Sequence, residues 1–247
     1  MLKFSLSDAK LWRNVIDAIS ELIDEANFIA TPEGISLRAM DPSHVAMVEV
    51  NLPKEFFDYY ECEDIMNIGI NLDEFRKVLR RASAKEKLDI EVTSDRKLKI
   101  VFSDRAKRTF SIPLIDISGE ELESPSIEFN VYSRILSTVF EDAVKDASLI
   151  SDHVKITAEK DMLIISASGE RGDVEVKLSE DTGSLLELNV KESSISTYSL
   201  NYLEDLVKTS KASDILVLEF SNEMPMKLSF ELPNNGRITY YLAPRIE

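Results

Sequence analysis

Hydrophobic and polar positions divide the 247-residue chain into short blocks of two kinds, helical and alternating. Apolar residues at helical spacing predict four helices. Three lie at about residues 8–26, 73–83 and 201–210, and the remaining one follows Ser133, which is expected to cap it. Asn71, with Glu74 three residues later, is expected to cap the second helix. Shorter apolar and alternating blocks predict strands at residues 2–6, 28–40 (a pair around a turn), 45–52, 68–71, 88–93, 98–102, 109–114, 154–157, 162–168, 174–178, 215–221, 226–232 and 237–242.

Residues 115–129 separate two halves of the chain that resemble each other. This stretch has no sustained period, and its Ser, Gly, Pro and acidic residues are typical of a linker that crosses a surface. One constant shift along the sequence aligns Phe102 with Phe230, and in the earlier quarter a slightly shorter shift aligns Ala26 with Ala147. We therefore predict an internal duplication, with domains at 1–114 and 130–247 and the linker at 115–129.

Acidic residues outnumber basic ones, 45 against 29, which gives a formal net charge of −16. Such a balance opposes nucleic-acid binding, because phosphates attract a basic surface. For any single helix, bases on the outer face are explained by an ordinary solvated surface. Their segregation onto the helices of an acidic chain is nevertheless typical of a nucleic-acid surface. The outer-face bases are Arg13, Lys77, Arg80, Arg81, Lys145, Lys208 and Lys211.

Other features limit the compartment and the chemistry. No apolar run approaches the roughly 18 residues of a membrane span, and the first residues do not form a signal peptide. A single cysteine, Cys62, fits a reducing intracellular compartment. Two histidines and one cysteine do not make a zinc site, and seven glycines include no P-loop or dinucleotide motif. The sequence therefore predicts no enzyme, no metal and no cofactor.

Four segments resemble the DNA sliding clamp, proliferating cell nuclear antigen, most closely its archaeal members. They are Leu-Arg-Ala-Met-Asp-Pro-Ser-His-Val at 37–45, Asp-Ala-Val-Lys-Asp-Ala at 142–147, Asn-Glu-Met-Pro-Met at 222–226 and Tyr-Tyr-Leu-Ala-Pro-Arg-Ile at 240–246. The resemblance implies an α+β clamp fold, in which each of two similar domains packs two helices on antiparallel sheets. It also implies that three subunits close a ring around duplex DNA, with helices lining the hole.

The resemblance assigns the bases to the pore of that ring. Positions that match the family's pore are Arg13, Lys77, Arg80, Lys145 and Lys208, while Arg81 and Lys211 come from the helical pattern alone. Asn14 and Ser20 stand where relatives often carry lysine, so this pore is expected to be less positive.

A second implied site is a pocket for partner peptides beneath the linker. For a single apolar member such as Val45, core packing is the simpler explanation, and Ser124 replaces an apolar residue of many relatives. The matching positions are Met40, His44, Val45, Met47, Leu122, Phe129, Pro225, Tyr241, Ala243, Pro244 and Ile246.

The implied ring also needs subunit edges, at about residues 106–112 and 174–179. Ion pairs from the first edge to Glu175, or to Glu141 and Asp142, are expected to join them. The edge positions are Lys107, Arg108, Thr109, Phe110, Val174, Glu175, Val176 and Lys177.

The resemblance implies duplex DNA, DNA polymerase, a clamp loader, flap endonuclease, DNA ligase and other proteins with clamp-binding peptides as partners. It favours a homotrimer in the cytoplasm and nucleoid of an archaeon, or in the nucleus of a eukaryote. Two alternatives stay open: one subunit of a heterotrimeric clamp, or a clamp-fold adaptor that never encircles DNA.

Overall fold

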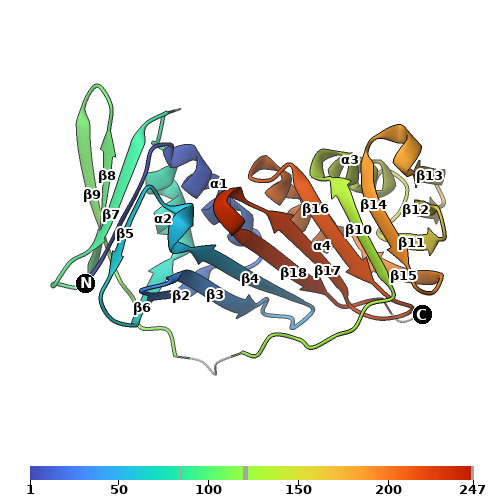
Figure 1. The fold of residues 1–247 in the computed structure, drawn as a ribbon, viewed down its shortest axis with the longest axis horizontal. Helices are drawn as coiled ribbons and strands as arrows, with labels where there is room; N and C mark the ends of the chain where they lie inside the picture. Colours follow the sequence, from blue (N-terminus) through green and yellow to red (C-terminus); the bar gives the residue numbers. More distant parts are fainter. Residues whose placement is uncertain (84, 119–121, 246–247) are drawn as a thin grey trace. The chain divides into compact units, whose positions relative to one another are not determined.

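The chain runs twice through the same series of elements, as the colours of Figure 1 show. The computed structural model describes residues 1–83, 85–118 and 122–245. Two compact units emerge, one of residues 1–42, 48–122 and 232–238, the other of residues 43–47, 123–231 and 239–247.

Among the described residues, the first series contains two helices and nine strands. Its elements are β1 (Leu2–Leu6), α1 (Ala9–Ile19), β2 (Glu25–Thr31), β3 (Gly34–Met40), β4 (Ala46–Pro53), the 3₁₀ turn η1 (Lys54–Phe56), β5 (Tyr59–Cys62), β6 (Met66–Asn71), α2 (Leu72–Leu79), β7 (Lys87–Val92), β8 (Lys97–Ser103) and β9 (Lys107–Pro113). One strand order is β5-β1-β7-β8-β9, and a second set runs β4-β3-β2-β6.

The second series repeats this order. Its elements are β10 (Val131–Leu136), α3 (Ser137–Ser148), β11 (His153–Glu159), β12 (Met162–Gly169), β13 (Gly172–Leu178), η2 (Glu180–Thr182), β14 (Leu185–Val190), β15 (Ser194–Ser199), α4 (Leu200–Leu206), η3 (Val207–Lys211), β16 (Ile215–Phe220), β17 (Met226–Glu231), η4 (Pro233–Asn235) and β18 (Arg237–Leu242). The strand orders are β14-β10-β16-β17-β18 and β13-β12-β11-β15. The α+β class and the duplication are therefore confirmed.

The shift that aligns Phe102 with Phe230 holds through most of the duplication. It carries the first residue of α1, Ala9, onto the first residue of α3, Ser137, and the start of β2 onto the start of β11. The shorter shift predicted for the earlier quarter is wrong, because Ala26 lies in β2 whereas Ala147 lies in α3. Apolar residues recur in both element types, so a short match at the wrong shift was possible.

The predicted third helix begins too early. Ser133 does not cap it; it is fully buried in β10, where its Oγ donates a hydrogen bond to the Leu218 carbonyl. Val131, Ser133 and Ile135 all point into the core, so β10 has strand alternation with a serine at one inward position. Helix α3 starts at Ser137 instead.

The first and second helices end earlier than predicted. Helix α1 stops at Ile19, and the Ser20 hydroxyl donates to the Ile16 carbonyl at the turn that follows. The buried Ile23 and Ala26 beyond it continue the apolar pattern into a turn and into β2. Helix α2 stops at Leu79, and its predicted cap is confirmed, because Asn71 Oδ1 accepts the Glu74 N–H at 3.0 Å.

Each unit has its own aromatic and aliphatic core. In the first unit Trp12 of α1 contacts the Phe4 ring at 5.1 Å and lies near Phe28. In the second unit Phe230 and Tyr240 meet edge to face, and the Tyr240 hydroxyl bonds the buried Thr209 at 2.9 Å. These contacts fix the helices on the sheets and so orient the helix faces that carry the bases. In the described part of the chain no helix is long and apolar enough to cross a membrane.

Candidate functional site

The helices α1 and α2 carry bases whose surroundings differ. Arg76 of α2, which sequence reasoning missed, lies mostly buried between Asp17 and Glu21, with both contacts at 3.0 Å. It fastens α2 to α1 rather than facing solvent. Lys77 is exposed and pairs with Glu74 at 2.7 Å, an interaction that raises the lysine pKa.

Three other predicted positions of the first unit are arginines. Arg80 and Arg81 follow the end of α2 and are exposed, and Arg13 of α1 is half-buried. Within the described residues, none of these three guanidinium groups has an ion pair. The end of α2 therefore presents two exposed arginines without an ion pair among the described residues.

The bases of the second unit sit beside carboxylates. Lys145 of α3 lies 2.7 Å from Glu141, and the hydrogen bond between them raises the Lys145 pKa. Burial raises the pKa of Glu141, but hydrogen bonds from Lys145 and Ser210 outweigh it and the carboxyl pKa falls. Lys208 pairs with Asp205 at 2.7 Å, and Lys211 is exposed at the end of η3. The neighbouring carboxylates weaken the positive field of Lys145 and Lys208.

Several positions predicted for the peptide pocket lie in the second unit, where the C-terminal segment meets the outer edge of β15. The chain after β18 docks there, because the Arg245 N–H donates to the Thr197 carbonyl at 2.8 Å and Arg245 Nη1 lies 3.2 Å from His153 Nδ1. Just before this point the Ala243 N–H donates to the Val45 carbonyl at 2.9 Å. Residues 43–47 and the C-terminal segment are thereby brought together.

The turn between β16 and β17, which carries the predicted pocket position Pro225, is tied to β15. The Asn222 side chain accepts the Ile195 N–H at 2.7 Å, and the Tyr198 hydroxyl donates to the Met224 carbonyl at 2.8 Å. Burial raises the pKa of Tyr198, so its hydroxyl stays a donor. Pro225 is thus held beside a buried tyrosine on a fixed turn.

The positions predicted for the pocket differ in burial. Val45, Phe129, Pro225, Tyr241, Ala243 and Pro244 are all half-buried, as expected for the wall of a surface pocket. His44 is exposed with φ of 58°, while Met47 is only 3 % exposed and belongs to the core. Met40 and Leu122 belong to the first unit, where Arg38 Nη1 donates to the Leu122 carbonyl. Ile246 lies outside the described residues.

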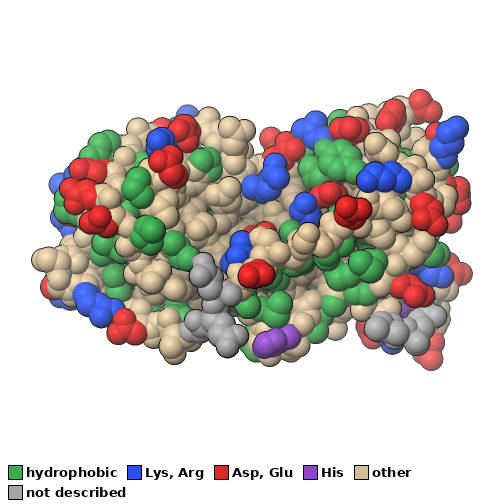
Figure 2. Space-filling view, turned by 60° about the horizontal axis from the view of Figure 1, so that its bottom comes forward, with side chains coloured by type: hydrophobic (Ala, Val, Ile, Leu, Met, Phe, Trp, Pro, Cys, Tyr) green, Lys and Arg blue, Asp and Glu red, His purple; other side chains and the backbone are tan. Residues whose placement is uncertain are grey.

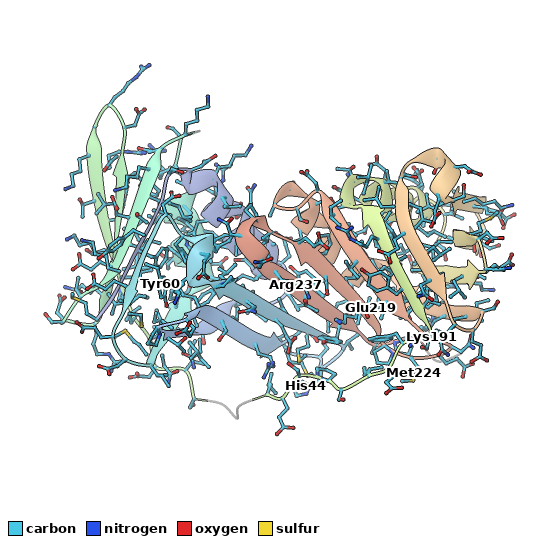
Figure 3. All side chains as sticks on the ribbon, viewed as in Figure 1. His44, Tyr60, Lys191, Glu219, Met224 and Arg237 are labelled. Atoms are coloured by element: carbon cyan, nitrogen blue, oxygen red, sulfur yellow. The ribbon has the colours of Figure 1, made fainter. Side chains whose placement is uncertain are left out.

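Two exposed apolar residues beside this pocket were missed from the sequence. Ile195 is 46 % and Met224 is 38 % exposed, and the Glu223 N–H donates to the Ile195 carbonyl. Figure 2 shows hydrophobic side chains reaching the surface among charged ones, and Figure 3 labels His44 and Met224 of this unit. A methionine between a glutamate and a proline in a turn was the available signal.

The predicted edge strands lie at the ends of their sheet orders. Strand β9 ends the order β5-β1-β7-β8-β9, and β13 ends the order β13-β12-β11-β15. Along β9, exposed Lys107 and Thr109 alternate with half-buried Arg108 and Phe110. Along β13, exposed Glu175 and Lys177 alternate with half-buried Val174 and Val176. Both strands can accept another strand by backbone pairing.

Within the single chain, charged residues at or near both edges already have partners. Arg108 Nη2 contacts both carboxylate oxygens of buried Glu86, at 2.8 and 2.6 Å. Glu175 pairs with Lys177, and Glu141 with Lys145. Ion pairs between subunits stay a prediction.

The duplicated fold, with paired helices that carry bases and with strands at sheet edges, is that of the two-domain DNA clamps. Residues 1–121 match the family model for the N-terminal domain of proliferating cell nuclear antigen, and residues 123–245 match that for its C-terminal domain. The chain belongs to the proliferating cell nuclear antigen family.

Relatives support the assignment over the full length. The DNA polymerase sliding clamp of Thermofilum pendens is 43 % identical over 248 residues, covering all of both chains. DNA polymerase sliding clamp 1 of Thermococcus kodakarensis is 43 % identical, covering 97 % of this chain and 96 % of its own length. A crystal structure of PCNA from Thermococcus kodakaraensis matches with a TM-score of 0.95 and 30 % identity, over 99 % of this chain and 100 % of that chain. A structure of the PCNA2-PCNA3 complex of Sulfolobus tokodaii matches with a TM-score of 0.93 and 28 % identity, over 99 % of this chain and 100 % of that chain.

Proposed function

We propose that this protein is a sliding clamp that encircles duplex DNA as a ring and tethers DNA polymerase for processive synthesis. It performs no chemistry itself. The observation that carries the proposal is the duplicated clamp fold, whose helices bear arginine and lysine in a chain of net charge −16. A ring holds DNA topologically, so its pore needs only weak, non-specific attraction to phosphates.

The tempered charges of the helices suit sliding. Lys77, Lys145 and Lys208 each have a carboxylate at 2.7 Å, so each attracts a phosphate less strongly than a free lysine. Arg13, Arg80, Arg81 and Lys211 complete the proposed pore surface. Weak contacts that exchange rapidly let a protein move along DNA without releasing it.

Other replication and repair proteins, among them a clamp loader, flap endonuclease and DNA ligase, use the pocket on β15. Half-buried aromatic and aliphatic walls suit an apolar plug, and the interdomain loop at 115–129 lies between domains 1–114 and 130–247. DNA and polymerase partners imply an intracellular location, the cytoplasm and nucleoid of an archaeal cell.

The ring forms by pairing β9 of one subunit with β13 of the next, in a head-to-tail interface that closes. A homotrimer is the simplest form. A heterotrimeric assembly is the second candidate, favoured by the structural match to the PCNA2-PCNA3 complex. An adaptor that never encircles DNA would not need bases on the helices.

Light scattering of the purified chain, diluted through the low micromolar range, tests ring closure. A mass three times the 27.9 kDa of one chain supports a homotrimer. A mass equal to that of a single chain at every concentration contradicts the homotrimer, and the heterotrimer and the adaptor then remain as candidates.

The pore assignment is tested by changing Lys77, Arg80 and Lys208 together to alanine. Stimulation of DNA polymerase on a primed circular template falls, and the salt dependence of clamp–DNA association weakens by up to about three in the log–log slope. The matched control removes Lys3, Lys160 and Arg171, which are also exposed, and keeps the parent behaviour. Equal effects from both variants would point to net charge rather than to a pore.

A further inference from the structure

A groove of about 410 Å³ opens in the first unit, away from the residues assigned above. Four segments line it: β2 with Asn27, β6 with Met66, Asn67 and Gly69, the turn between β7 and β8 with Arg96, and the chain that leaves β9 at residues 114–118. Its volume falls within the range of ligand and peptide sites.

The backbone contacts of this groove repeat those of the peptide pocket. The Ile115 N–H donates to the Gly69 carbonyl at 2.9 Å, and at the equivalent position of the second unit the Thr197 carbonyl accepts the Arg245 N–H at 2.8 Å. In each unit, therefore, the chain leaving the last strand docks on the outer edge of the corresponding strand, β6 or β15.

The turns correspond as well. The Arg96 N–H donates to the Thr93 carbonyl, and at the equivalent turn of the second unit the Met224 N–H donates to the Ser221 carbonyl. Arg96 therefore occupies the place that exposed Met224 holds beside the pocket. The two units thus share the docking contact and this turn hydrogen bond, whereas the left-handed residue is Arg96 in the first turn and Glu223 in the second, and the side chains differ.

Side chains at the groove define what it accepts. Arg96 is 64 % exposed and donates to the 85 % exposed Asp116, which raises the arginine pKa. Ile115 and Ile117 on either side of Asp116 are half-buried. The segment Ile115–Ile117 of the chain itself, apolar–acidic–apolar in sequence, thus lies along one wall of the groove.

The remaining space lies along β6. This strand ends its sheet order, and within the described residues its outer edge meets only the single bridge from Gly69 to Ile115. The edge before Gly69 can receive another extended chain by backbone pairing. Two asparagines, Asn27 and Asn67, line the same side and offer amide donors and acceptors.

We propose that this groove is a second docking site, which binds an extended segment of a partner protein with an acidic side chain between two apolar ones. The segment adds to the edge of β6, and its carboxylate takes the Arg96 guanidinium from Asp116. The proposal rests on the proposed function, because it treats the groove as the duplicated counterpart of the peptide pocket.

A fluorescein-labelled peptide, Ser-Ile-Asp-Ile-Asp-Ile-Ser, is the probe, and anisotropy with the full chain measures its binding. Arg96→Met, which copies the turn of the second unit, weakens binding about ten-fold, as expected for loss of one charge-assisted contact. Asp116→Ser strengthens binding several-fold, because it removes the internal competitor. Arg105→Met, at an exposed arginine in the next turn, changes nothing.

A lysine version of the peptide controls for charge, since a net charge of −16 attracts it without specificity. Binding of the acidic probe that is equally insensitive to Arg96→Met and Arg105→Met overturns the proposal, as does the absence of binding. An apolar and aromatic clamp-binding peptide, measured with Tyr241→Ser, reports the pocket separately. If Tyr241→Ser leaves the binding of this apolar peptide unchanged while Arg96→Met still weakens the binding of the acidic probe, the pocket assignment alone is wrong.

Discussion

The buried ion pair between Glu86 and Arg108 makes a prediction that can be worked from distances. Glu86 is 3 % exposed, and its carboxylate also accepts the Ser83 N–H at 2.8 Å. Arg108 lies over the Phe102 ring at 5.3 Å, and its Nη1 donates to the Arg81 carbonyl at 3.0 Å. One guanidinium therefore ties edge strand β9 to the basic turn after α2.

Arg108→Ala leaves the Glu86 carboxylate buried with the Ser83 N–H as its remaining partner. Removing one member of a buried pair costs about 3–5 kcal/mol. Because the Arg108 side chain is 32 % exposed, water reaches the vacated site, and we expect about 2–3 kcal/mol. Adding Glu86→Gln removes the buried charge and restores at least about 1 kcal/mol.

Urea unfolding followed by tryptophan fluorescence measures these changes. Trp12 is the single tryptophan and is 3 % exposed in the core of the first unit, so it reports the unit that contains the pair. Arg105→Ala is the matched control, because that arginine is exposed in the turn of the same hairpin. A cost below about 0.5 kcal/mol for Arg108→Ala would refute the reasoning, because surface substitutions alone cause that much.

The same pair fixes the sign of a pH effect. Burial raises the Glu86 pKa, but the hydrogen bonds from Arg108 and Ser83 outweigh it and hold the pKa below its ordinary value of 4.5. The stability that ionised Glu86 contributes is present above the ordinary value and is lost as the pH falls through the lowered pKa. Between pH 7 and pH 3 the parent therefore loses more stability than the Glu86→Gln variant.

Two further predictions concern the first unit. Asn71→Ala removes the cap hydrogen bond from the Glu74 N–H at 3.0 Å and lowers the free energy of unfolding by about 1 kcal/mol in the same urea assay. The control, Asn51→Ala at an exposed position, lowers it little. Equal losses would show that the cap does not stabilise the helix. Gly69→Ala places a methyl group 2.1 Å from the Ile115 carbonyl oxygen, which releases Ile115 from β6. Hydrogen exchange at the Ile115 amide then accelerates, and unchanged protection would contradict the close approach.

The sequence predicted element types well where the periodicity was unbroken. Helix α2, its Asn71 cap and strand β18 follow from local pattern and capping chemistry. The predicted ends of elements were wrong where apolar residues continue through a turn, as between Ile19 and Ala26. The prediction that Ser133 caps a helix was wrong because a serine that is buried in a strand and donates to a neighbouring carbonyl cannot be told from a cap by local sequence.

Site positions were harder to predict from the residues than from the resemblance. Val45 and Ala243 meet through a backbone hydrogen bond although they lie near opposite ends of the sequence, and no spacing rule detects such a contact. The pairing of Glu86 with Arg108 is likewise a tertiary contact, and both residues look like ordinary surface charges in the sequence. The edge positions of β9 and β13 depend on sheet order, which alternation alone leaves open.

The two copies of the duplication keep backbone contacts and change side chains. The Ala9 N–H donates to the Glu86 carbonyl at 2.8 Å, and at the equivalent position of the second unit the Ser137 N–H donates to the Asp214 carbonyl at 2.9 Å. Asp214 is exposed, so this position has a buried carboxylate only in the first unit, near edge strand β9.

The same divergence separates Arg96 from Met224 on turns with the same hydrogen bond. A turn fixed by its backbone tolerates either side chain, because the exposed residue contributes little to stability. Substitution at such a position therefore changes what the turn binds while the fold is kept. The proposed groove and the proposed pocket thus share a turn hydrogen bond but differ in the exposed side chain, and Arg96→Met is expected to change specificity while the fold is kept.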